Sequence, residues 1–264
     1  MAPKRRALDS FLSLGASAGV IAAALGDLPP GLAQPSTHGG MHHQEGGEGG
    51  EGGEGASSSE RRSDAELLLV LAQMQGHLLV AGELVDQGQL KAAEPHVGHP
   101  VDELYGALQP AIAERRIAPF LPVLEDLRQQ VRIDPAAPST ARKLAAARQA
   151  VAAATRSLSA NPVTDPAAVM VLARHLAATA SEEYGAAVAE GRVVEVIEYQ
   201  DARGFLLEAQ QLLQATTAAD PALAARLRRM EQGIAAMLKA VPTAVPPQKA
   251  WLSPEKLEQR RKQL

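Results

Sequence analysis

Cysteine is absent from the 264 residues of the chain. The protein therefore has no disulfide, no thiol nucleophile, no cysteine-ligated iron–sulfur cluster and no zinc site built on thiolates. Aromatic residues are scarce as well, at 3%, whereas hydrophobic residues make up 46%. Strands favour aromatic and β-branched side chains, so a chain rich in alanine and leucine is expected to form closely packed helices.

A strong charge of one sign is also lacking. The net charge is −4, and no stretch combines clustered basic residues with aromatic ones, which argues against a nucleic-acid partner. A Gly-x-x-x-x-Gly-Lys-Ser/Thr phosphate loop and a His-Glu-x-x-His motif are missing too. The Gly-x-Ser-x-Gly spacing occurs only at residues 15–19, inside the apolar N-terminal run, and Gly-x-Gly-x-x-Gly spacing only inside the Glu-Gly-Gly repeats, so neither has the strand–turn–helix context of a catalytic or phosphate-binding motif. Acid–base chemistry by carboxylates and histidines stays an alternative. No nucleophile lies at a catalytic spacing from a base, however, so we predict that the protein is not an enzyme.

The N-terminus has the features of an export signal. Basic residues 4–6 precede the apolar run Phe11–Leu25, and a small-residue cleavage site ends at Ala33. The run is shorter than the roughly twenty apolar residues that a membrane helix needs, and no later segment is expected to span a membrane. We therefore expect residues 1–33 to be a cleaved signal peptide and the mature protein to be periplasmic. An uncleaved N-terminal anchor is the alternative.

Residues 34–60 form a low-complexity tail of Glu-Gly-Gly repeats with three histidines, His38, His42 and His43. Glycine loses much backbone entropy on ordering and the glutamates repel one another, so the tail is predicted to be disordered. Its histidines and glutamates make it a weak metal-gathering segment, and a solvated spacer is the alternative interpretation.

Hydrophobic residues recur every three or four positions from residue 61 onward, which predicts helices. Ser63 and Glu66 form a capping box, and Asp-Pro pairs at 165–166 and 220–221 begin two later helices. Helices are expected over residues 63–87, 89–94, 101–115, 118–132, 140–158, 165–190, 194–213 and 220–241, with an interruption over 95–100. Short connections predict an all-α, up-and-down bundle of about six to seven helices in residues 61–241. Residues 242–264 are expected to form a linker and a short, frayed C-terminal helix.

Two histidines three residues apart suggest a metal site near the first helix. His96 and His99 lie on one side of a turn, and Glu103 follows in the next helical turn. His77 lies in the preceding helix beside Gly76, where another helix can approach closely. A short connection is expected to bring these side chains together, and mixed imidazole and carboxylate ligands suit iron, copper, zinc or manganese. Met74 and Tyr105 are candidate auxiliary ligands.

A second group of ligand types lies in the C-terminal half. Glu198 and Asp201 share one face of a helix, and Glu183 projects from the preceding antiparallel helix. Helical bundles build metal sites from carboxylates on facing helices, so this group either completes the histidine cluster or forms a second site. The alternative is a charged solvent face with Arg192 and Arg203 as partners. Tyr184 and Tyr199 are the candidate auxiliary ligands of this second group.

Residues 184–194 and 198–199 resemble the helical periplasmic domain of bacterial FTR1-type iron permeases. Both have a tyrosine, a stretch of small residues, a glycine stop and a Glu-Tyr pair. The Gly76-His77 pair resembles the start of the Gly-x-His-x-x-Glu motif of imelysin-like and EfeO-like periplasmic iron proteins, although Val80 stands in place of the glutamate. These resemblances imply iron as the metal and an inner-membrane metal transporter as a partner.

The sequence therefore predicts a periplasmic metal-binding bundle that acts in metal uptake, delivery or sensing, with iron favoured and copper or zinc as alternatives. Its candidate ligands are His77, His96, His99, Glu103, Glu183, Glu198 and Asp201. A cell-envelope scaffold or adaptor without metal is the second hypothesis, because the alanine-rich helix over 140–158 suits close packing between helices or between chains.

Overall fold

The computed structural model describes residues 62–158 and 165–264, and these residues are almost entirely helical. The predicted all-α helical bundle is confirmed. The expected signal peptide, the glycine-rich tail and its histidines lie outside the described residues.

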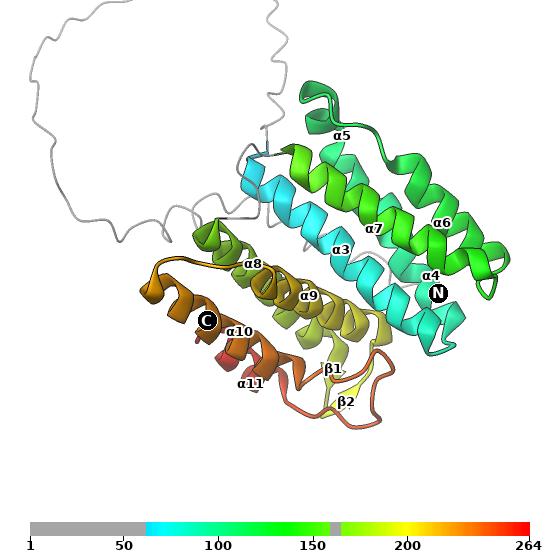
Figure 1. Ribbon diagram of the computed structural model, residues 1–264. Helices are drawn as coiled ribbons and strands as arrows, with labels where there is room; N and C mark the ends of the chain where they lie inside the picture. Colours follow the sequence, from blue (N-terminus) through cyan, green and yellow to red (C-terminus); the bar gives the residue numbers. More distant parts are fainter. Residues whose placement is uncertain (1–61, 159–164) are drawn as a thin grey trace, which may run out of the picture. The chain divides into compact units, whose positions relative to one another are not determined.

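Helix α3 (Asp64–Asp86) is the central helix of the bundle (Figure 1). It begins with the predicted capping box: the Glu66 backbone N–H donates to Ser63 Oγ at 3.3 Å, and the Ser63 backbone N–H donates to the Glu66 carboxylate at 2.7 Å. The helix ends before Gly88, whose φ of +71° is a conformation that glycine adopts at little steric cost.

By length and composition, α3 is also the one described helix that is long and apolar enough to cross a membrane. The expectation that no segment after the signal would meet this criterion is therefore wrong. Within its most apolar 18-residue window, 67% of the helix is buried inside the bundle. Helix α3 is apolar on all sides because it lies in the core, with neighbouring helices on several sides.

A set of helices and one π-helical turn follows α3 in the N-terminal half. They are α4 (Leu90–His99), η2 (Pro100–Leu104), α5 (Tyr105–Glu114), α6 (Leu121–Ile133) and α7 (Pro138–Leu158). Helices α4 and α7 pack directly on α3, and α6 packs on both α4 and α7 (Figure 1).

The interruption expected over residues 95–100 is absent. Helix α4 continues through Pro95, because its buried side chains Ala93 and Val97 pack into the core and offset the hydrogen bond that proline removes. At Pro100 the chain widens into η2, where the Tyr105 backbone N–H donates to the Pro100 carbonyl five residues earlier. The last two turns of α4, which carry the candidate histidines, are therefore continuous helix.

The C-terminal half contains four helices and a short hairpin among its described residues. They are α8 (Pro166–Ala187), β1 (Val188–Ala189), β2 (Arg192–Val193), α9 (Val196–Gln214), α10 (Pro221–Leu238) and α11 (Pro254–Arg261). Asp165 and Asp220 cap α8 and α10 as predicted. Helix α8 ends at Ala187 rather than near Glu190, because β1 and β2 pair antiparallel around a turn at Glu190 and Gly191, where φ is 51° and 72°.

The C-terminal helix α11 is packed onto the bundle and does not fray as expected. Leu257 is fully buried in the core cluster that α8, α9 and α10 form. In the preceding linker, the Leu252 carbonyl accepts a hydrogen bond of 2.7 Å from Tyr184, and Ser181 donates to Glu258 of α11 at 3.0 Å. These contacts join residues 242–264 to the helical domain.

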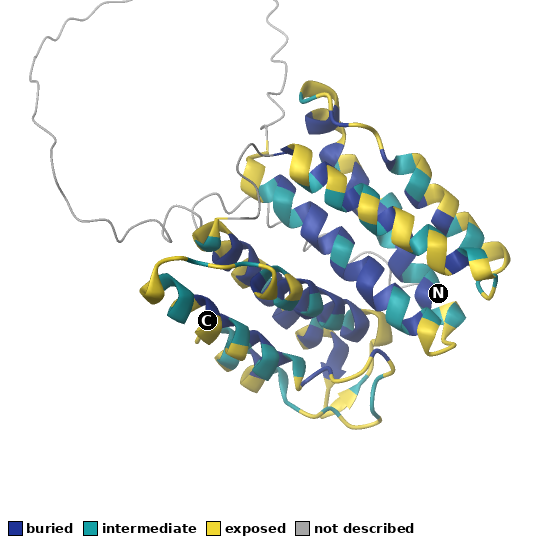
Figure 2. Cartoon of the chain, viewed as in Figure 1, coloured by how far each residue is buried: buried dark blue, intermediate teal, exposed yellow. Residues whose placement is uncertain are grey.

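The two halves meet where α3 packs against α8 and α9, with their buried faces turned toward one another (Figure 2). Helices α3 and α9 cross at a pair of glycines. A Cβ atom at Gly204 would overlap the carbonyl oxygen of Gly76, and one at Gly76 would lie 2.7 Å from the Phe205 ring. The backbones of α3 and α9 are therefore in direct contact at this crossing.

Candidate metal centre

The glycine crossing positions the first two candidate ligands. His77 follows Gly76 on α3, and Asp201 lies one turn before Gly204 on α9. Because the backbones touch, these two side chains meet between the helices, with His77 Nδ1 at 2.8 Å from Asp201 Oδ1. The close helix approach expected at Gly76 is present, and its partner is Gly204.

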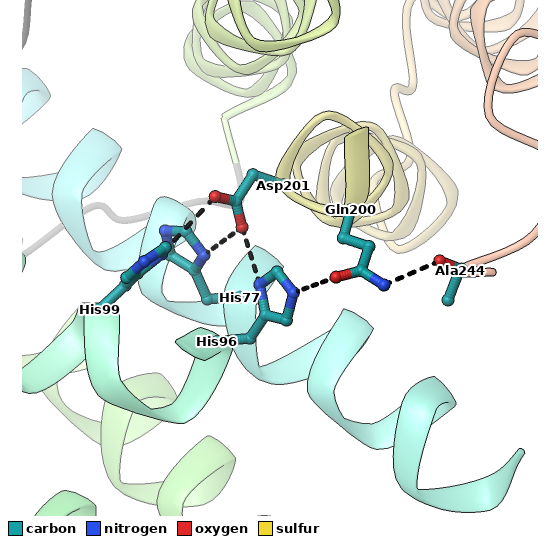
Figure 3. Close-up of polar contacts among 6 residues, drawn as sticks. All are labelled: His77, His96, His99, Gln200, Asp201 and Ala244. Atoms are coloured by element: carbon teal, nitrogen blue, oxygen red, sulfur yellow. Dashed lines mark hydrogen bonds and ion pairs between the residues drawn. The ribbon is translucent and has the colours of Figure 1, made fainter. Parts of the chain in front are cut away.

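Helix α4 supplies two more imidazoles, three residues apart on one helix face. His96 Nδ1 lies 2.8 Å from the same Oδ1 atom of Asp201, and His99 Nδ1 lies 3.5 Å from Oδ2. Figure 3 shows the three rings around this single carboxylate. One ligand atom from each of His77, His96, His99 and Asp201 lies within 4.8 Å of the other three. The fold thus brings three predicted histidines and one predicted carboxylate into one cluster.

Gln200 fixes the protonation of His96. Its amide nitrogen donates to the Ala244 carbonyl at 3.0 Å, so its Oε1 atom faces His96 Nε2 at 2.8 Å (Figure 3). An amide oxygen only accepts hydrogen bonds, and His96 therefore carries a proton on Nε2. In the neutral ring, Nδ1 then presents a lone pair to the Asp201 carboxylate.

Two acceptors that face each other at 2.8 Å repel unless a positive charge lies between them. His77 adds to this imbalance: its buried Nδ1 atom has no hydrogen-bond partner among the described residues, since its short contact with Asp201 lacks hydrogen-bond geometry. Unpartnered buried polar atoms are rare because they are costly. Extra protons on the imidazoles or a bound metal ion would supply the missing positive charge.

Electrostatics keep the Asp201 carboxylate ionised. Burial alone would raise its pKa, but the charges and short contacts of His77 and His96 hold that pKa well below the usual range. Burial lowers the pKa of His77 and favours its neutral form. Burial acts in the same direction on His99, but its hydrogen bond to Asp201 and the carboxylate charge outweigh burial and raise the pKa of His99 to about 9. The ionised Asp201 and the neutral His77 are in the protonation states that bind metals, whereas a metal ion must displace a proton from His99.

Asp201 and Gln200 lie in a C-terminal segment that matches a known family model. Residues 159–264 match the family model of the iron permease-associated 4-helix bundle domain. The predicted resemblance to FTR1-type iron permeases is confirmed, and the match extends beyond the roughly fifty residues, 165–215, over which it was expected. No curated protein and no solved structure matches the chain. The three histidines precede the matched segment, so the cluster combines residues from both halves.

Three further carboxylates act on His99 from outside the cluster. They are Glu183 and Glu198, in the matched segment, and Glu103 on η2. Burial raises the pKa of Glu183 to about 8, and the charges of Asp201 and Glu198 add to this shift. Burial also raises the pKa of Glu198. These three predicted ligands lie near His99 without joining the four-residue cluster.

The predicted auxiliary ligands lie in the apolar core. Tyr184 donates to a linker carbonyl, and its ring centroid is 6.4 Å from that of Tyr199. Tyr105 packs on Phe120 with the ring centroids 4.9 Å apart. Met74 is fully buried in α3. The ring contacts described for these tyrosines are with aromatic neighbours and not with the ligand cluster.

The alternative of a solvent-facing pair between Arg203 and the carboxylates of α9 does not match the structure. Arg203 instead donates two hydrogen bonds of 2.6 and 2.5 Å to Glu83 on α3, and a third to the Val241 carbonyl. Asp201 is 6% exposed, so it faces the interface between the helices rather than solvent. The pair formed by Arg203 and Glu83 adds a second polar link between the two halves.

Sequence reasoning did not identify Gln200 or Gly204. Gln200 directly precedes Asp201, but glutamine is common on helix surfaces and nothing local marks it as buried. Gly204 had a usable signal: it is a small residue one turn after Asp201, and a glycine pair allows two helices to touch. Pairing it with Gly76 required knowledge of which helices are neighbours.

The donor set of the cluster fits a first-row transition metal. Imidazole suits zinc, copper, iron and nickel, and no thiolate is available. Metal–ligand bonds near 2 Å in a tetrahedral site separate neighbouring ligand atoms by about 3.4 Å. The separations of 2.8 and 3.5 Å between imidazole nitrogens and Asp201 oxygens bracket that value.

Proposed function

We propose that this protein binds a transition metal ion, with iron favoured, and acts in metal uptake, delivery or sensing in the periplasm. The observation that carries the proposal is the convergence of three imidazoles on the buried carboxylate of Asp201, with a lone pair of His96 directed at it. Structural polar clusters in protein cores pair donors with acceptors, whereas this cluster, with His96 neutral, sets an imidazole lone pair against a carboxylate, which either a second proton on His96 or a metal ion would relieve. A metal ion satisfies all four groups at once.

The family match favours iron, because the ligands alone do not discriminate. Imidazole binds iron, copper and zinc, and carboxylate is the harder donor. Residues 159–264 match a domain described as iron permease-associated, which supports iron as the ion and an inner-membrane iron permease as the partner. A bound cation would favour the ionised form of nearby carboxyl groups such as Glu183, whose pKa burial raises to about 8, and the resulting negative charge would compensate a more highly charged ion.

The basic residues 4–6, the apolar run Phe11–Leu25 and the cleavage site at Ala33 support a periplasmic location. A periplasmic carrier must take up and release its ion, and one ligand here is open to solvent. The His99 side chain is 21% exposed, against 4% for His77 and 0% for His96. We infer that the ion enters and leaves on the His99 side.

Calorimetric titration of the purified protein with Fe²⁺ under anaerobic conditions, and separately with Cu²⁺ and Zn²⁺, tests the proposal. We expect one ion per chain and a dissociation constant at or below the micromolar range. Asp201→Asn keeps the shape of the side chain but removes the charge, and His99→Ala removes a partly exposed ligand. Each is expected to weaken binding at least about tenfold.

His175→Ala is the matched control, since His175 is an exposed histidine of α8 outside the cluster. It is expected to bind metal like the wild type. Elemental analysis of protein purified from its native compartment identifies the ion. Equal binding heats for the wild type and the His96→Ala/His99→Ala double variant would remove the site and leave the metal-free scaffold as the better account.

A further inference from the structure

A cavity lined by arginines lies among the C-terminal helices and shares no described lining residue with the metal centre. Its volume is ≈ 420 Å³, and α8, α10 and α11 form its walls. We refer to it as the arginine groove. Its arginines are Arg174 of α8, Arg226 and Arg229 of α10, and Arg260 of α11. No acidic side chain is among the described residues that line it.

Two of these arginines have no counter-charge. Arg226 and Arg229 make no hydrogen bond or ion pair with any described residue. Arg174 donates to the main-chain oxygen of Leu264 at 3.0 Å, and Arg260 donates to the Ala236 carbonyl at 2.5 Å. The four guanidinium groups thus lie together with no acidic side chain among them, and the main-chain carboxylate of Leu264 contacts Arg174.

Guanidinium groups held together repel one another. The pKa of Arg174 is lowered, first by burial and then by the positive charge of Arg226. Elsewhere in the described chain, arginines with acidic neighbours pair with them, as Arg128 does with Asp102 and Arg132 with Glu94. A concave surface with an excess of positive charge concentrates anions, and the four guanidinium groups of the groove exceed the single terminal carboxylate of Leu264, so the groove is a site for an anion.

We propose that the arginine groove binds a phosphate-bearing anion. A phosphate group carries about two charges and several oxygens, which planar guanidinium forks engage in pairs. Met170 and Met230 line the same groove and provide an apolar wall for the rest of the ligand. The volume of the groove falls in the range of small-molecule sites. The phosphate is carried either by a soluble molecule or by the headgroup of a lipid.

This inference is independent of the metal function, because none of the groove residues belongs to the ligand cluster. The matched segment, residues 159–264, contains every described lining residue, whereas the metal centre also needs α3 and α4. Failure of one proposal therefore leaves the other standing.

Two probes test the groove in metal-free buffer at constant ionic strength. Pyrophosphate is titrated into the full chain by calorimetry, and vesicles of phosphatidylcholine with and without phosphatidic acid are tested for co-sedimentation. The Arg226→Gln/Arg229→Gln variant is expected to bind the probe that the groove recognises at least about tenfold more weakly than the wild type. It should remain folded, because both side chains are exposed and unpartnered, and far-UV circular dichroism with thermal melting checks this.

Arg228→Gln is the matched control: it removes one charge from the same helix, but Arg228 does not line the groove. The affinity of the Arg228→Gln variant for the same probe should stay within about twofold of the wild-type affinity. Pyrophosphate binding that depends on Arg226 and Arg229 identifies a soluble ligand, and vesicle binding with the same dependence identifies a lipid headgroup. Absence of binding to both probes, or an equal loss in Arg228→Gln, overturns the proposal.

Discussion

Gln200 influences the candidate metal centre without being a ligand. Its amide oxygen accepts from His96 Nε2, and its amide nitrogen is held by the Ala244 carbonyl. The proton of His96 therefore stays on Nε2, and the Nδ1 lone pair faces Asp201. Residues that orient metal ligands in this way change metal affinity about 10–100-fold when they are replaced.

We therefore expect Gln200→Ala to weaken metal binding by about 10–100-fold, because His96 is then free to rotate and to change tautomer. Calorimetric titration of variant and wild type measures the two dissociation constants. Gln73→Ala is the control: Gln73 is also a buried glutamine, on α3, and it donates to Thr179 at 3.5 Å. An unchanged dissociation constant in Gln200→Ala would contradict the orienting role.

Glu208 is a buried acid outside the metal centre, and its ionisation opposes folding. It is 8% exposed, and burial raises its pKa from 4.5 to about 7 against the opposing charge of Arg148. The carboxyl group ionises more easily in the unfolded chain than in the folded one. The wild type therefore loses stability as pH rises from about 4.5 to about 7, and this loss stays constant at higher pH.

Glu208→Gln removes the ionisation, so the free energy of unfolding of the variant is expected to increase relative to that of the wild type as the pH rises. The gain in free energy of unfolding between about pH 4 and about pH 8 should reach at most about 3 kcal/mol. Urea denaturation of both proteins at the two pH values measures it. If the two proteins differ by the same free energy at both pH values, Glu208 does not titrate as described.

At the scale of the element, the helix starts could be predicted because capping is local. Ser63, Asp165 and Asp220 each accept a hydrogen bond from a backbone N–H three residues later. The course of the chain over residues 95–100 could not be predicted in the same way. Proline disfavours a helix interior, and only burial of the surrounding side chains against α3 tells us that α4 tolerates Pro95.

Gly204→Ala is expected to destabilise the protein by about 1–3 kcal/mol and to abolish metal binding. The added methyl group overlaps the Gly76 carbonyl, so α3 and α9 must move apart, and His77 then moves away from Asp201. Chemical denaturation and calorimetric titration measure the two effects.

Gly185→Ala is the matched control, because a Cβ at that position of α8 meets no described atom within 4 Å. It should be neutral or stabilise the helix by up to about 1 kcal/mol. The role of the glycine crossing would be refuted by a Gly204→Ala variant that binds metal like the wild type.

At the scale of the whole molecule, the cluster joins two halves of the chain. His77 and His96 come from α3 and α4, and Asp201 comes from the segment that matches the iron permease-associated domain. An ion bound by all of them links the halves in the folded state, and the unfolded chain holds no such site. Metal binding should therefore stabilise the entire helical unit.

With metal at about one hundred times its dissociation constant, we expect a stabilisation of about 2.7 kcal/mol, which raises the melting temperature by about 5–10 °C. Thermal melts with metal and with an excess of chelator measure the shift. The His96→Ala/His99→Ala variant should melt at one temperature under both conditions. A wild-type melting temperature that is insensitive to metal and chelator would favour the scaffold hypothesis.

The helical class, most helix starts and the ligand types could be predicted from the amino-acid sequence, because these depend on residues within one or two turns of each other. The sequence identified His77, His96, His99 and Asp201 as candidates, but it ranked Glu103, Glu183 and Glu198 beside them. Which of these side chains meet depends on how distant helices pack against one another. His96 and Asp201 are 105 residues apart in the chain. Their contact depends on how closely α3 and α9 approach, which is set by the contact between Gly76 and Gly204.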